Sequence, residues 1–270
     1  PCCCARAGGR SGQRLQLMVS EMRRFVFDPE RRDGDKVILS AAESYHITKV
    51  LRLQPGTGIE VLDGRGGVYA AKIVEVGSSV VVRLLECREE GGSSDSGRVR
   101  LWVGQGLLKG GKMDGIVQQC TELGVARLTP FVSSRCQGTM TELRGRTKAE
   151  RWDRIVVAAC KQCRRSTLMV VDAPVDFTTM ISQIDHDPGA LRLIFWEEEH
   201  EFRLHQDLLR PGTFATVCIL LGPEGGLAPA EIAAARESGW QTVSLGRRIL
   251  RAETATLTAV SLVQYLAGNL

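Results

Sequence analysis

The first part of the chain has the hydropathy pattern of a small β domain. Short apolar runs, bounded by Gly, Ser and Asp, recur between positions 22 and 87, and such runs are typical of strands joined by tight turns. We expect strands over residues 25–27, 37–39, 59–62, 68–76 and 80–85. The DGRGG sequence before the fourth run is typical of a hairpin turn. One helix interrupts the series, because Ser40 and Glu43 form a capping box ahead of an apolar stripe. The pattern predicts a small, closed β-barrel with one helix.

Beyond residue 98 the pattern alternates between strands and helices. We expect strands over residues 99–103, 128–132, 169–171, 191–195, 217–221 and 243–245. Apolar residues at helical spacing predict helices over residues 113–123, 152–160, 229–238 and 253–266, the first of which ends at Gly124. The alternation predicts an α/β fold, with a parallel sheet and helices on both faces. Ligands of such sheets bind at the carboxyl ends of the strands.

The two patterns meet at a segment without apolar residues. Residues 88–97 are charged and rich in Gly and Ser, so we interpret them as a linker between domains at 22–87 and 98–270. Residues 1–21 lack the apolar core of a signal peptide and are interpreted as a disordered leader. An organelle transit peptide is an alternative, since acidic residues are scarce there. A misplaced start ahead of Met22 is another.

Composition and charge narrow the function classes. The 270 residues carry a net charge of +4, which does not by itself indicate nucleic-acid binding. Nine Cys include one CxxC pair, at positions 160 and 163, and the four His show no metal-ligand spacing. We therefore expect no metal and a reducing compartment, the cytoplasm. No run approaches the roughly 18 apolar residues of a membrane span, so we expect no membrane partner.

Two loops that follow predicted strands carry candidate binding chemistry. The loop after residues 217–221 reads GPEGG, whose glycines let a ligand approach the backbone N–H groups closely. Its alternative interpretation is a tight turn into the next helix. The loop after residues 243–245 reads GRRILRAET and mixes Ile249 and Leu250 with three Arg. It is either an exposed basic turn or a segment whose apolar residues a ligand or a partner subunit covers.

A third loop, GLLKGGK at residues 106–112, fits the GxxxxGK pattern of a phosphate-binding loop between a strand and a helix. Met113 stands where such a loop carries the Ser or Thr that binds magnesium, which argues against a nucleotide triphosphatase. Contact with RNA phosphates is the other interpretation of Lys109 and Lys112.

Several segments together resemble one enzyme family. RRFVF, YHITKVLRLQPG, LLKGGKMDGIVQQCTELGV, LLGPEGG and SLGRRILRAETA are similar to segments of the bacterial 16S ribosomal RNA uridine-N3 methyltransferases. These enzymes belong to the SPOUT class, whose C-terminal sheet is tied in a trefoil knot. The similarity runs in order from about Met22 to the C-terminus. GPEGG indicates only the class, whereas KMDGIVQQCTELGV and the RRF start point to this subfamily.

The resemblance implies both a fold and a cofactor. Residues 22–87 would form a PUA-like RNA-binding β-barrel, and residues 98–270 a SPOUT domain that binds S-adenosylmethionine (SAM) in its knot. Two copies would form a homodimer, and no metal would take part. The residues implied to surround SAM are Glu197, Leu221, Gly222, Glu224, Gly225, Gly226, Ser244, Leu245, Gly246, Ile249 and Leu250. Ala228 departs from the family pattern, in which a Ser or Thr caps the next helix. We expect a weaker cap, at a cost of about 1 kcal/mol.

The implied reaction methylates N3 of a specific uridine in small-subunit ribosomal RNA, as free RNA or in the assembled small subunit. N3 must lose its proton before it attacks, so the site needs a cation near the base oxygens and a proton acceptor. We assign Arg251 as the cation and Glu253 or Glu224 as the acceptor. The alternatives are a phosphate contact for Arg251, a helix cap for Glu253 and an ordering role for Glu224 in its own loop.

Basic residues supply the candidate RNA contacts. We expect them at Arg23, Arg24, His46, Lys49, Arg52, Lys109 and Lys112, with Arg164 and Arg165 as an extension. Within the enzyme class the nearest alternative is methylation of the ribose 2′-oxygen. Remote alternatives are the triphosphatase at residues 106–112 and a knotted RNA-binding module without catalysis.

Overall fold

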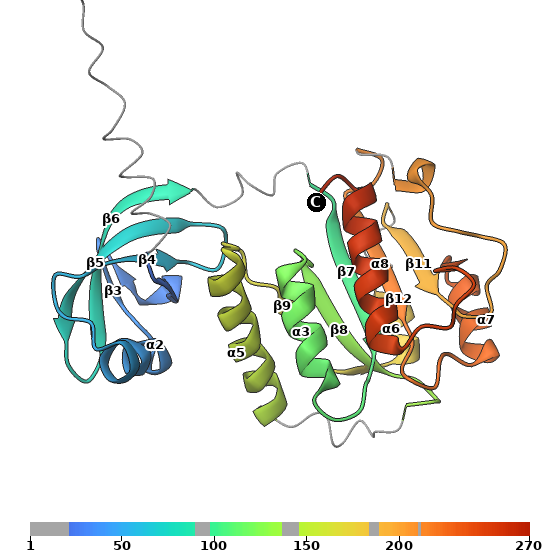
Figure 1. Cartoon of the computed structure of the whole chain (residues 1–270), viewed down its shortest axis with the longest axis horizontal. Coiled ribbons are helices and arrows are strands. Elements are labelled where there is room, and N and C mark those ends of the chain that lie inside the picture. The colour runs from blue at the N-terminus through green and yellow to red at the C-terminus, as the bar shows by residue number, and fades with distance from the viewer. Residues whose placement is uncertain (1–21, 90–97, 137–145, 184–188, 210–211) are drawn as a thin grey trace, which may run out of the picture. The chain divides into compact units, whose positions relative to one another are not determined.

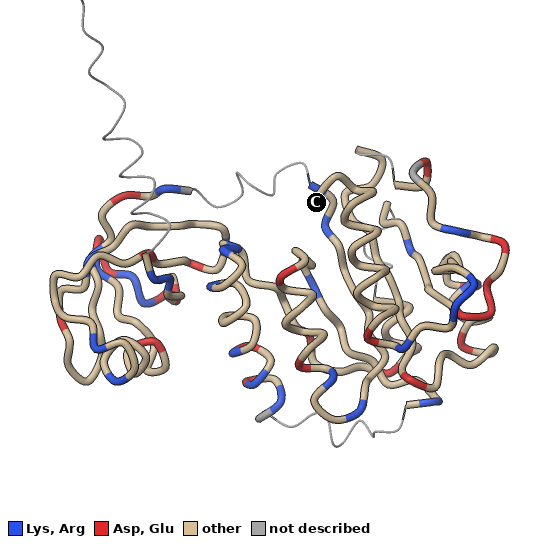
Figure 2. Tube along the Cα trace, viewed as in Figure 1, with Lys and Arg blue, Asp and Glu red and all other residues tan. Residues whose placement is uncertain are grey.

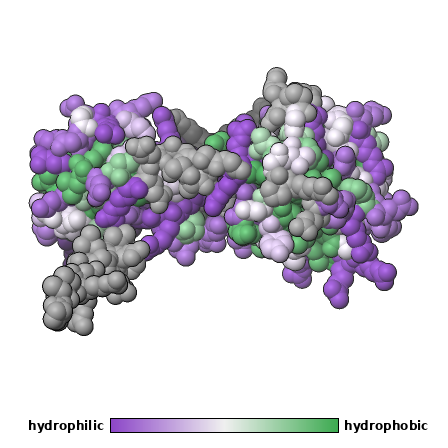
Figure 3. Space-filling view, turned by 90° about the horizontal axis from the view of Figure 1, so that it is seen from above, coloured by the Kyte–Doolittle hydropathy of each residue, from purple (hydrophilic) through white to green (hydrophobic). Residues whose placement is uncertain are grey.

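The computed structural model describes residues 22–89, 98–136, 146–183, 189–209 and 212–270 (Figure 1). The chain divides into two compact units, Pro1–Ser94 and Asp95–Leu270, with the boundary inside the predicted linker. The predicted leader at residues 1–21 and residues 90–97 of that linker lie outside the described residues. Hydrophobic residues reach the surface among hydrophilic ones in both units (Figure 3).

The N-terminal unit is built on one strongly curved sheet. Its strands are β1 (Arg24–Val26), β2 (Arg32–Asp33), β3 (Lys36–Ile38), β4 (Gly58–Leu62), β5 (Val68–Val76) and β6 (Val80–Glu89), and a 3-10 turn, η1 (Pro29–Arg31), follows β1. The hydrogen-bonded order is β1-β4-β5-β6-β3-β2, in which only the β1–β4 pair is parallel. The sheet encloses a core that includes Phe25, Val37, Ile59 and Val82. Among the described pairings none joins β1 to β2, so the predicted closure of the barrel is not made by its end strands.

The single helix of this unit has two parts, α2 (Ala41–Tyr45) and a π-helical continuation, η2 (His46–Leu51). The Ser40 hydroxyl accepts a hydrogen bond from the Glu43 amide at 3.3 Å, which confirms the predicted N-terminal cap. The buried Glu43 carboxylate accepts a hydrogen bond from the Val26 amide at 3.4 Å, which ties the helix to β1. The helix ends at Arg52, whose backbone is left-handed with φ 53°.

The C-terminal unit is a parallel sheet covered by helices on both faces, as predicted (Figure 1). The strands are β7 (Arg100–Gly106), β8 (Arg127–Val132), β9 (Val170–Val171), β10 (Val175–Asp176), β11 (Leu191–Phe195), β12 (Thr216–Leu221) and β13 (Gln241–Val243). Their order is β10-β8-β7-β12-β11-β13, and β9 pairs with β8. Every pairing is parallel, so the carboxyl ends of the strands lie along one edge. The helices are α3 (Lys112–Glu122), α5 (Arg146–Cys163), α6 (Phe177–Ser182), α7 (Pro229–Glu237) and α8 (Ala252–Leu266), with a 3-10 turn, η4 (Gln206–Leu209).

Burial on both faces of the sheet explains why residues 217–221 of the central strand β12 are all apolar. Val217, Ile219 and Leu221 pack into the core that includes residues of α3, α5 and α8. The intervening residues Cys218 and Leu220 pack into the core that includes residues of α6 and α7. Successive side chains of a strand point to opposite faces, so a strand covered on both sides needs apolar residues at every position.

The structure differs from the predictions at several short or edge elements, among them β2, which was not predicted. β13 begins and ends two residues earlier than the predicted 243–245, because an edge strand paired only with β11 accommodates the exposed Gln241. β10 and α6 were not predicted, since each is short. The Asp176 carboxylate caps the start of α6 and accepts a hydrogen bond from the Thr179 amide at 2.7 Å.

Helices of the described segments all fall short of the length or apolarity that a bilayer crossing requires. The trefoil knot implied by the resemblance stays a prediction.

Candidate functional site

Three loops at the carboxyl edge of the parallel sheet surround a cavity of about 680 Å³. They follow β11, β12 and β13, and the third continues into the first turn of α8. Lys112, at the start of α3, completes the lining. The lining residues are Lys112, Phe195, Trp196, Glu197, His200, Leu221, Gly222, Pro223, Glu224, Gly226, Ser244, Leu245, Gly246, Arg247, Arg248, Ile249, Leu250, Arg251, Ala252, Glu253 and Ala255. The volume suits a small-molecule cofactor, since ligand pockets commonly measure about 300–1,000 Å³.

The cavity brings together nearly all the residues that the sequence assigned to cofactor binding. Of that set, all but Gly225 line the cavity. The Gly225 carbonyl instead accepts a hydrogen bond from the Arg135 guanidinium at 3.2 Å. The predicted catalytic residues Arg251, Glu253 and Glu224 also line it.

Glycines let the loop after β12 lie against its neighbours. Gly226 has φ 69°, and a Cβ atom there would overlap the Glu197 carboxylate. A Cβ on Gly106, the last residue of β7, would lie 2.5 Å from the Pro223 nitrogen. At Gly226 the positive φ favours glycine, and at Gly106 the nearby backbone and proline ring require it, so the loop after β12 can lie directly over the end of β7.

The helix after this loop begins as the sequence predicted, without a side-chain cap. Ala228 is the N-cap of α7 and offers no side-chain acceptor. The Glu231 carboxylate accepts a hydrogen bond from the Ala228 amide and another from the Ser134 amide, both at 2.8 Å. Glu231 therefore stabilises the start of α7 and links it to the segment that follows β8.

The acidic triplet after β11 divides into one anchor and two exposed residues. Glu199 accepts hydrogen bonds from the Glu201 and Phe202 amides at 3.0 and 3.2 Å, from the Thr242 hydroxyl, and from Arg236 at 3.3 Å. The Thr242 hydroxyl, followed by these amides and Arg236, lowers the pKa of Glu199 to about 2 against the effect of burial. Glu197 and Glu198 are exposed. Glu199 therefore fixes the loop that presents Glu197 to the cavity.

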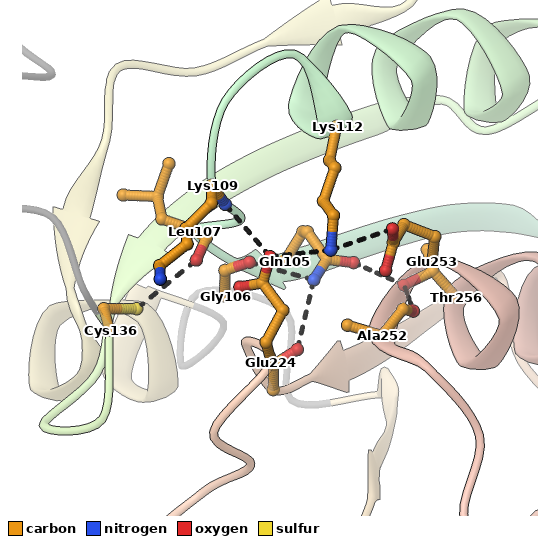
Figure 4. A network of polar contacts seen from close by, with 11 residues as sticks. Gln105, Gly106, Leu107, Lys109, Lys112, Cys136, Glu224, Ala252, Glu253 and Thr256 are labelled. Carbon is orange, nitrogen blue, oxygen red and sulfur yellow. Dashed lines mark hydrogen bonds and ion pairs between the residues drawn. The ribbon is translucent and has the colours of Figure 1, made fainter.

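Lys112 bridges two of the predicted catalytic carboxylates (Figure 4). Its Nζ lies 3.0 Å from Oε1 of Glu224 and 3.0 Å from Oε1 of Glu253. The Glu224 oxygen also accepts a hydrogen bond from the Lys109 amide at 3.1 Å. Figure 2 shows acidic and basic positions gathered where the β7–α3 loop meets the beginning of α8.

These contacts shift the pKa values of all three groups. The hydrogen bonds that the Lys112 ammonium donates to Glu253 and then to Glu224 raise the pKa of Lys112. Burial raises the pKa of Glu224, but its own amide, Lys112 and the Lys109 amide outweigh burial, so the net pKa is lowered. The pKa of Glu253 is lowered by its own backbone amide and then by Lys112. At neutral pH the cluster consists of one cation and two anions.

Two buried polar residues beneath this cluster were missed by the sequence analysis. The Gln105 amide nitrogen donates to the carbonyls of Gly106 at 2.9 Å and Gly222 at 3.3 Å. The Thr256 hydroxyl donates to the Gln105 side-chain oxygen at 2.6 Å. This chain joins β7, the loop after β12 and α8 (Figure 4). The available signal was a Gln near the end of a mostly apolar strand segment, residues 101–106.

The segment between β13 and α8 is exposed around the cavity. Ile249 is 87% exposed, and Arg247, Arg248 and Arg251 are exposed as well. Arg251 is the N-cap of α8, with no hydrogen bond from its side chain to the helix. An isoleucine this exposed at the rim of a cavity agrees with the expectation that something covers it.

The predicted RNA contacts differ in how exposed their side chains are. Arg23, Lys49, Arg52, Lys109 and Arg164 are exposed. The Arg24 side chain is only 12% exposed and forms an ion pair with the buried Glu60, which also pairs with Arg88.

Two further candidates are engaged in packing or hydrogen bonding. His46 is half-buried with its ring edge-on to Phe25 at 6.0 Å. Arg165 donates a hydrogen bond to the Thr121 carbonyl at 3.1 Å. The described residues contain no group of three or more His, Cys, Asp and Glu side chains arranged to hold a metal ion.

Both units match families of known proteins. Residues 95–264 match the RNA methyltransferase domain model, and residues 39–85 match the RNA methyltransferase PUA domain model. The chain is 34% identical over 244 residues to Ribosomal RNA small subunit methyltransferase E of a Synechocystis strain, covering 90% of this chain and 77% of that protein. It is 29% identical to the Bacillus subtilis protein of the same name, covering 84% and 89%.

Solved structures agree with these matches. A Ribosomal RNA small subunit methyltransferase E from Neisseria gonorrhoeae bound to SAM has a TM-score of 0.77 and 29% identity, covering 91% of this chain and 98% of that one. A Legionella pneumophila protein in complex with SAM has a TM-score of 0.79 and 28% identity, with the same coverage. The matches span both units in chain order, and this chain therefore belongs to the RNA methyltransferase family.

Proposed function

We propose that this protein transfers the methyl group of SAM to N3 of a specific uridine in small-subunit ribosomal RNA. The observation that carries the proposal is the cavity at the carboxyl edge of the sheet, where predicted cofactor and catalytic residues from three separate loops line one space. The names of the relatives support the RNA class, and SAM in two similar structures supports the methyl donor. The choice of uridine N3 rests on the sequence resemblance.

The lining residues fit SAM chemically. Leu221, Leu245, Ile249 and Leu250 supply apolar surface for an adenine ring, and Ile249 is left exposed without a ligand. The glycines of the loop after β12 open the backbone to hydrogen bonding with polar edges. Glu197 presents a carboxylate beside Gly226, where it suits the protonated amino group in the methionine part of SAM. When bound, the cofactor supplies a methyl group already activated by its sulfonium centre.

The protein has to remove the uracil proton and stabilise the resulting charge. Arg251 stands at the N-terminus of α8, where the helix dipole adds positive potential to its guanidinium. We assign it to the uracil oxygens that gain charge as N3 loses its proton. Glu224 and Glu253 are ionised at neutral pH because their pKa values are lowered. A weakly basic carboxylate of this kind accepts the hydrogen bond from N3–H and passes the proton on to water.

RNA binding is proposed for the exposed basic residues of the N-terminal unit. Arg23, Lys49 and Arg52 form what we call the basic cluster. Arg24 is left out, because its guanidinium is engaged with Glu60. Lys109 extends the proposed contacts in the C-terminal unit. A ribosomal substrate is met in the cytoplasm, or in an organelle if residues 1–21 act as a transit peptide.

A homodimer is proposed on the outer face of α8. Leu262 and Tyr265 are 41% and 69% exposed, and they lie one helical turn apart on the same face. Apolar side chains repeated on one helix face are typical of an interface. A second copy would cover them.

The triphosphatase alternative loses support from the position of Lys112. In a phosphate-binding loop this lysine meets the phosphates, but here it lies between two carboxylates that would repel them. Met113, at the position of the magnesium-binding hydroxyl, is buried.

Transfer of labelled methyl groups tests the proposal. Purified protein is incubated with methyl-labelled SAM and small ribosomal subunits, free small-subunit RNA or transfer RNA. We expect label in ribosomal RNA, an unchanged SAM affinity in Arg251→Ala and a loss of turnover in that variant, with partial activity in Arg251→Lys. If Arg251→Ala kept both full turnover and SAM affinity, the role of Arg251 would be wrong.

A further inference from the structure

Lys112 places a fixed cation in the cavity that the proposed reaction does not yet use. The side chain is 41% exposed and lines the cavity together with Arg251 and Glu253. Glu224 and Glu253 take two of its three N–H donors, each at 3.0 Å. Among the described contacts the third N–H of the ammonium has no protein partner, and because Lys112 lines the cavity this N–H is available to a ligand there.

The surrounding charges restrict what that ligand group can be. Lys112 and its two carboxylates carry a net charge of −1, so a group with a full, localised negative charge such as a phosphate is disfavoured beside them, whereas Arg251 along the same cavity offsets the charge that spreads over a uracil anion. A neutral carbonyl oxygen is acceptable at this position, and it becomes a stronger acceptor as negative charge develops on it. The same reasoning disfavours the RNA-phosphate contact that the sequence suggested for Lys112.

We infer that Lys112 donates its third N–H to a carbonyl oxygen of the target uracil and stabilises the base as N3 loses its proton. This inference rests on the proposed uridine-N3 reaction and adds a second cation to the one assigned at Arg251. The N3–H electron pair stays on the base, and the proton leaves to solvent through a carboxylate. That pair forms the N–CH₃ bond in place of the S–CH₃ bond, whose electrons remain on sulfur.

The carboxylates of Glu224 and Glu253 make Lys112 suitable as a fixed cation. They hold Nζ at a fixed position from two different elements, the loop after β12 and the first turn of α8. They also keep the amine protonated, because their hydrogen bonds raise its pKa. A cation positioned in advance stabilises developing charge without reorganising during the reaction.

The pH dependence of turnover separates this role from a structural one. Lys112→Met removes the cation, and we expect kcat with saturating small subunits to fall about 100-fold, the effect of losing one such donor. The rise of the rate with pH should also move to higher pH, because the uracil anion becomes harder to form. SAM affinity should change less than about threefold. Lys112→Arg should keep the wild-type pH profile, and Lys148→Met, on the exposed side of α5, is the matched control.

Other charged groups around Lys112 are Glu224 and Glu253 from facing elements, and Glu197, His200, Arg247, Arg248 and Arg251 along the cavity. Because the imidazole of His200 lines the same cavity, the profiles are repeated in a His200→Asn background. If Lys112→Met fails to fold, Lys112→Gln replaces it, with SAM binding as the test of folding.

The outcomes are distinct. A wild-type protein that forms no 3-methyluridine overturns the proposed function and this inference with it. An active wild type whose Lys112→Met variant keeps its kcat overturns the inference alone. A loss of equal factor at every pH overturns it as well, because that result indicates a structural role.

Discussion

The contact between the end of β7 and the loop after β12 predicts a large effect from one methyl group. In Gly106→Ala, the new Cβ would lie 2.5 Å from the Pro223 nitrogen, 2.6 Å from its Cδ and 2.8 Å from the Gly222 carbonyl carbon. Ordinary contacts of a Cβ atom begin at 3.4 Å, so the loop and the strand must separate by about 1 Å. Overpacking of this kind costs about 1–3 kcal/mol in folding free energy.

The same displacement should weaken cofactor binding. Gly222 and Pro223 line the cavity, so a shift of this loop displaces residues that we propose contact SAM. If SAM draws the loop back, binding must restore the overlap, and affinity falls about tenfold for each 1.4 kcal/mol of strain. Urea unfolding measures the free energy of folding, and titration calorimetry measures the dissociation constant for SAM.

Gly115→Ala is the matched control for this substitution. A Cβ at Gly115 meets nothing within 4 Å, and the residue lies inside α3, so we expect stabilisation by about 0.5–1 kcal/mol with unchanged SAM affinity. A Gly106→Ala protein with wild-type unfolding free energy and wild-type SAM affinity would show that the end of β7 does not lie this close to Gly222 and Pro223.

Three further predictions concern other parts of the molecule. Glu199→Gln should weaken SAM binding, and Glu198→Gln should not. Because the pKa of Glu199 is about 2 in the folded protein against 4.5 in the unfolded one, the wild type should lose folding free energy as the pH falls from 4.5 to 2. Glu199→Gln should lose less over this range, as acid titration followed by circular dichroism would reveal. Glu60→Ala leaves Arg24 and Arg88 without their shared carboxylate and should lower the unfolding free energy by about 3 kcal/mol in urea denaturation, an expectation contradicted by a change under 1 kcal/mol. Neutralising the whole basic cluster should reduce the slope of log affinity for small-subunit RNA against log salt by about 2–3, and an unchanged slope would remove those residues from the RNA surface.

The parts of the fold that could be predicted from sequence are those encoded by local pattern. The buried strand β12 appears as an apolar run because both faces are covered, and the hairpin between β4 and β5 is signalled by its glycine-rich turn. The end of α3 is marked by Gly124, whose φ of 78° suits glycine. Short elements such as α6 were missed, and the edge strand β13 was shifted.

The site could be predicted as far as its loops, but not as far as its contacts. GPEGG and GRRILRAET indicated the cavity because each follows a strand, the first being rich in glycine and the second combining apolar and basic residues. Lys112 and Glu224 are 112 positions apart, and nothing local to either indicates that they meet. The hydrogen bond between Thr256 and Gln105 spans 151 positions and depends on the fold in the same way. Arg24 looked like its exposed neighbours in sequence, and only the pairing of β1 with β4 places it beside Glu60.

The identity of the methylated nucleoside tests directly whether the protein methylates N3 of uridine. Small ribosomal subunits from cells that lack the activity are incubated with the protein and methyl-labelled SAM, and the RNA is digested to nucleosides and analysed by mass spectrometry. We expect the labelled methyl group in 3-methyluridine, and we expect this signal to be lost in Arg251→Ala. Label in a 2′-O-methyl nucleoside would contradict the assignment of uridine N3 and of the residues proposed to stabilise its anion.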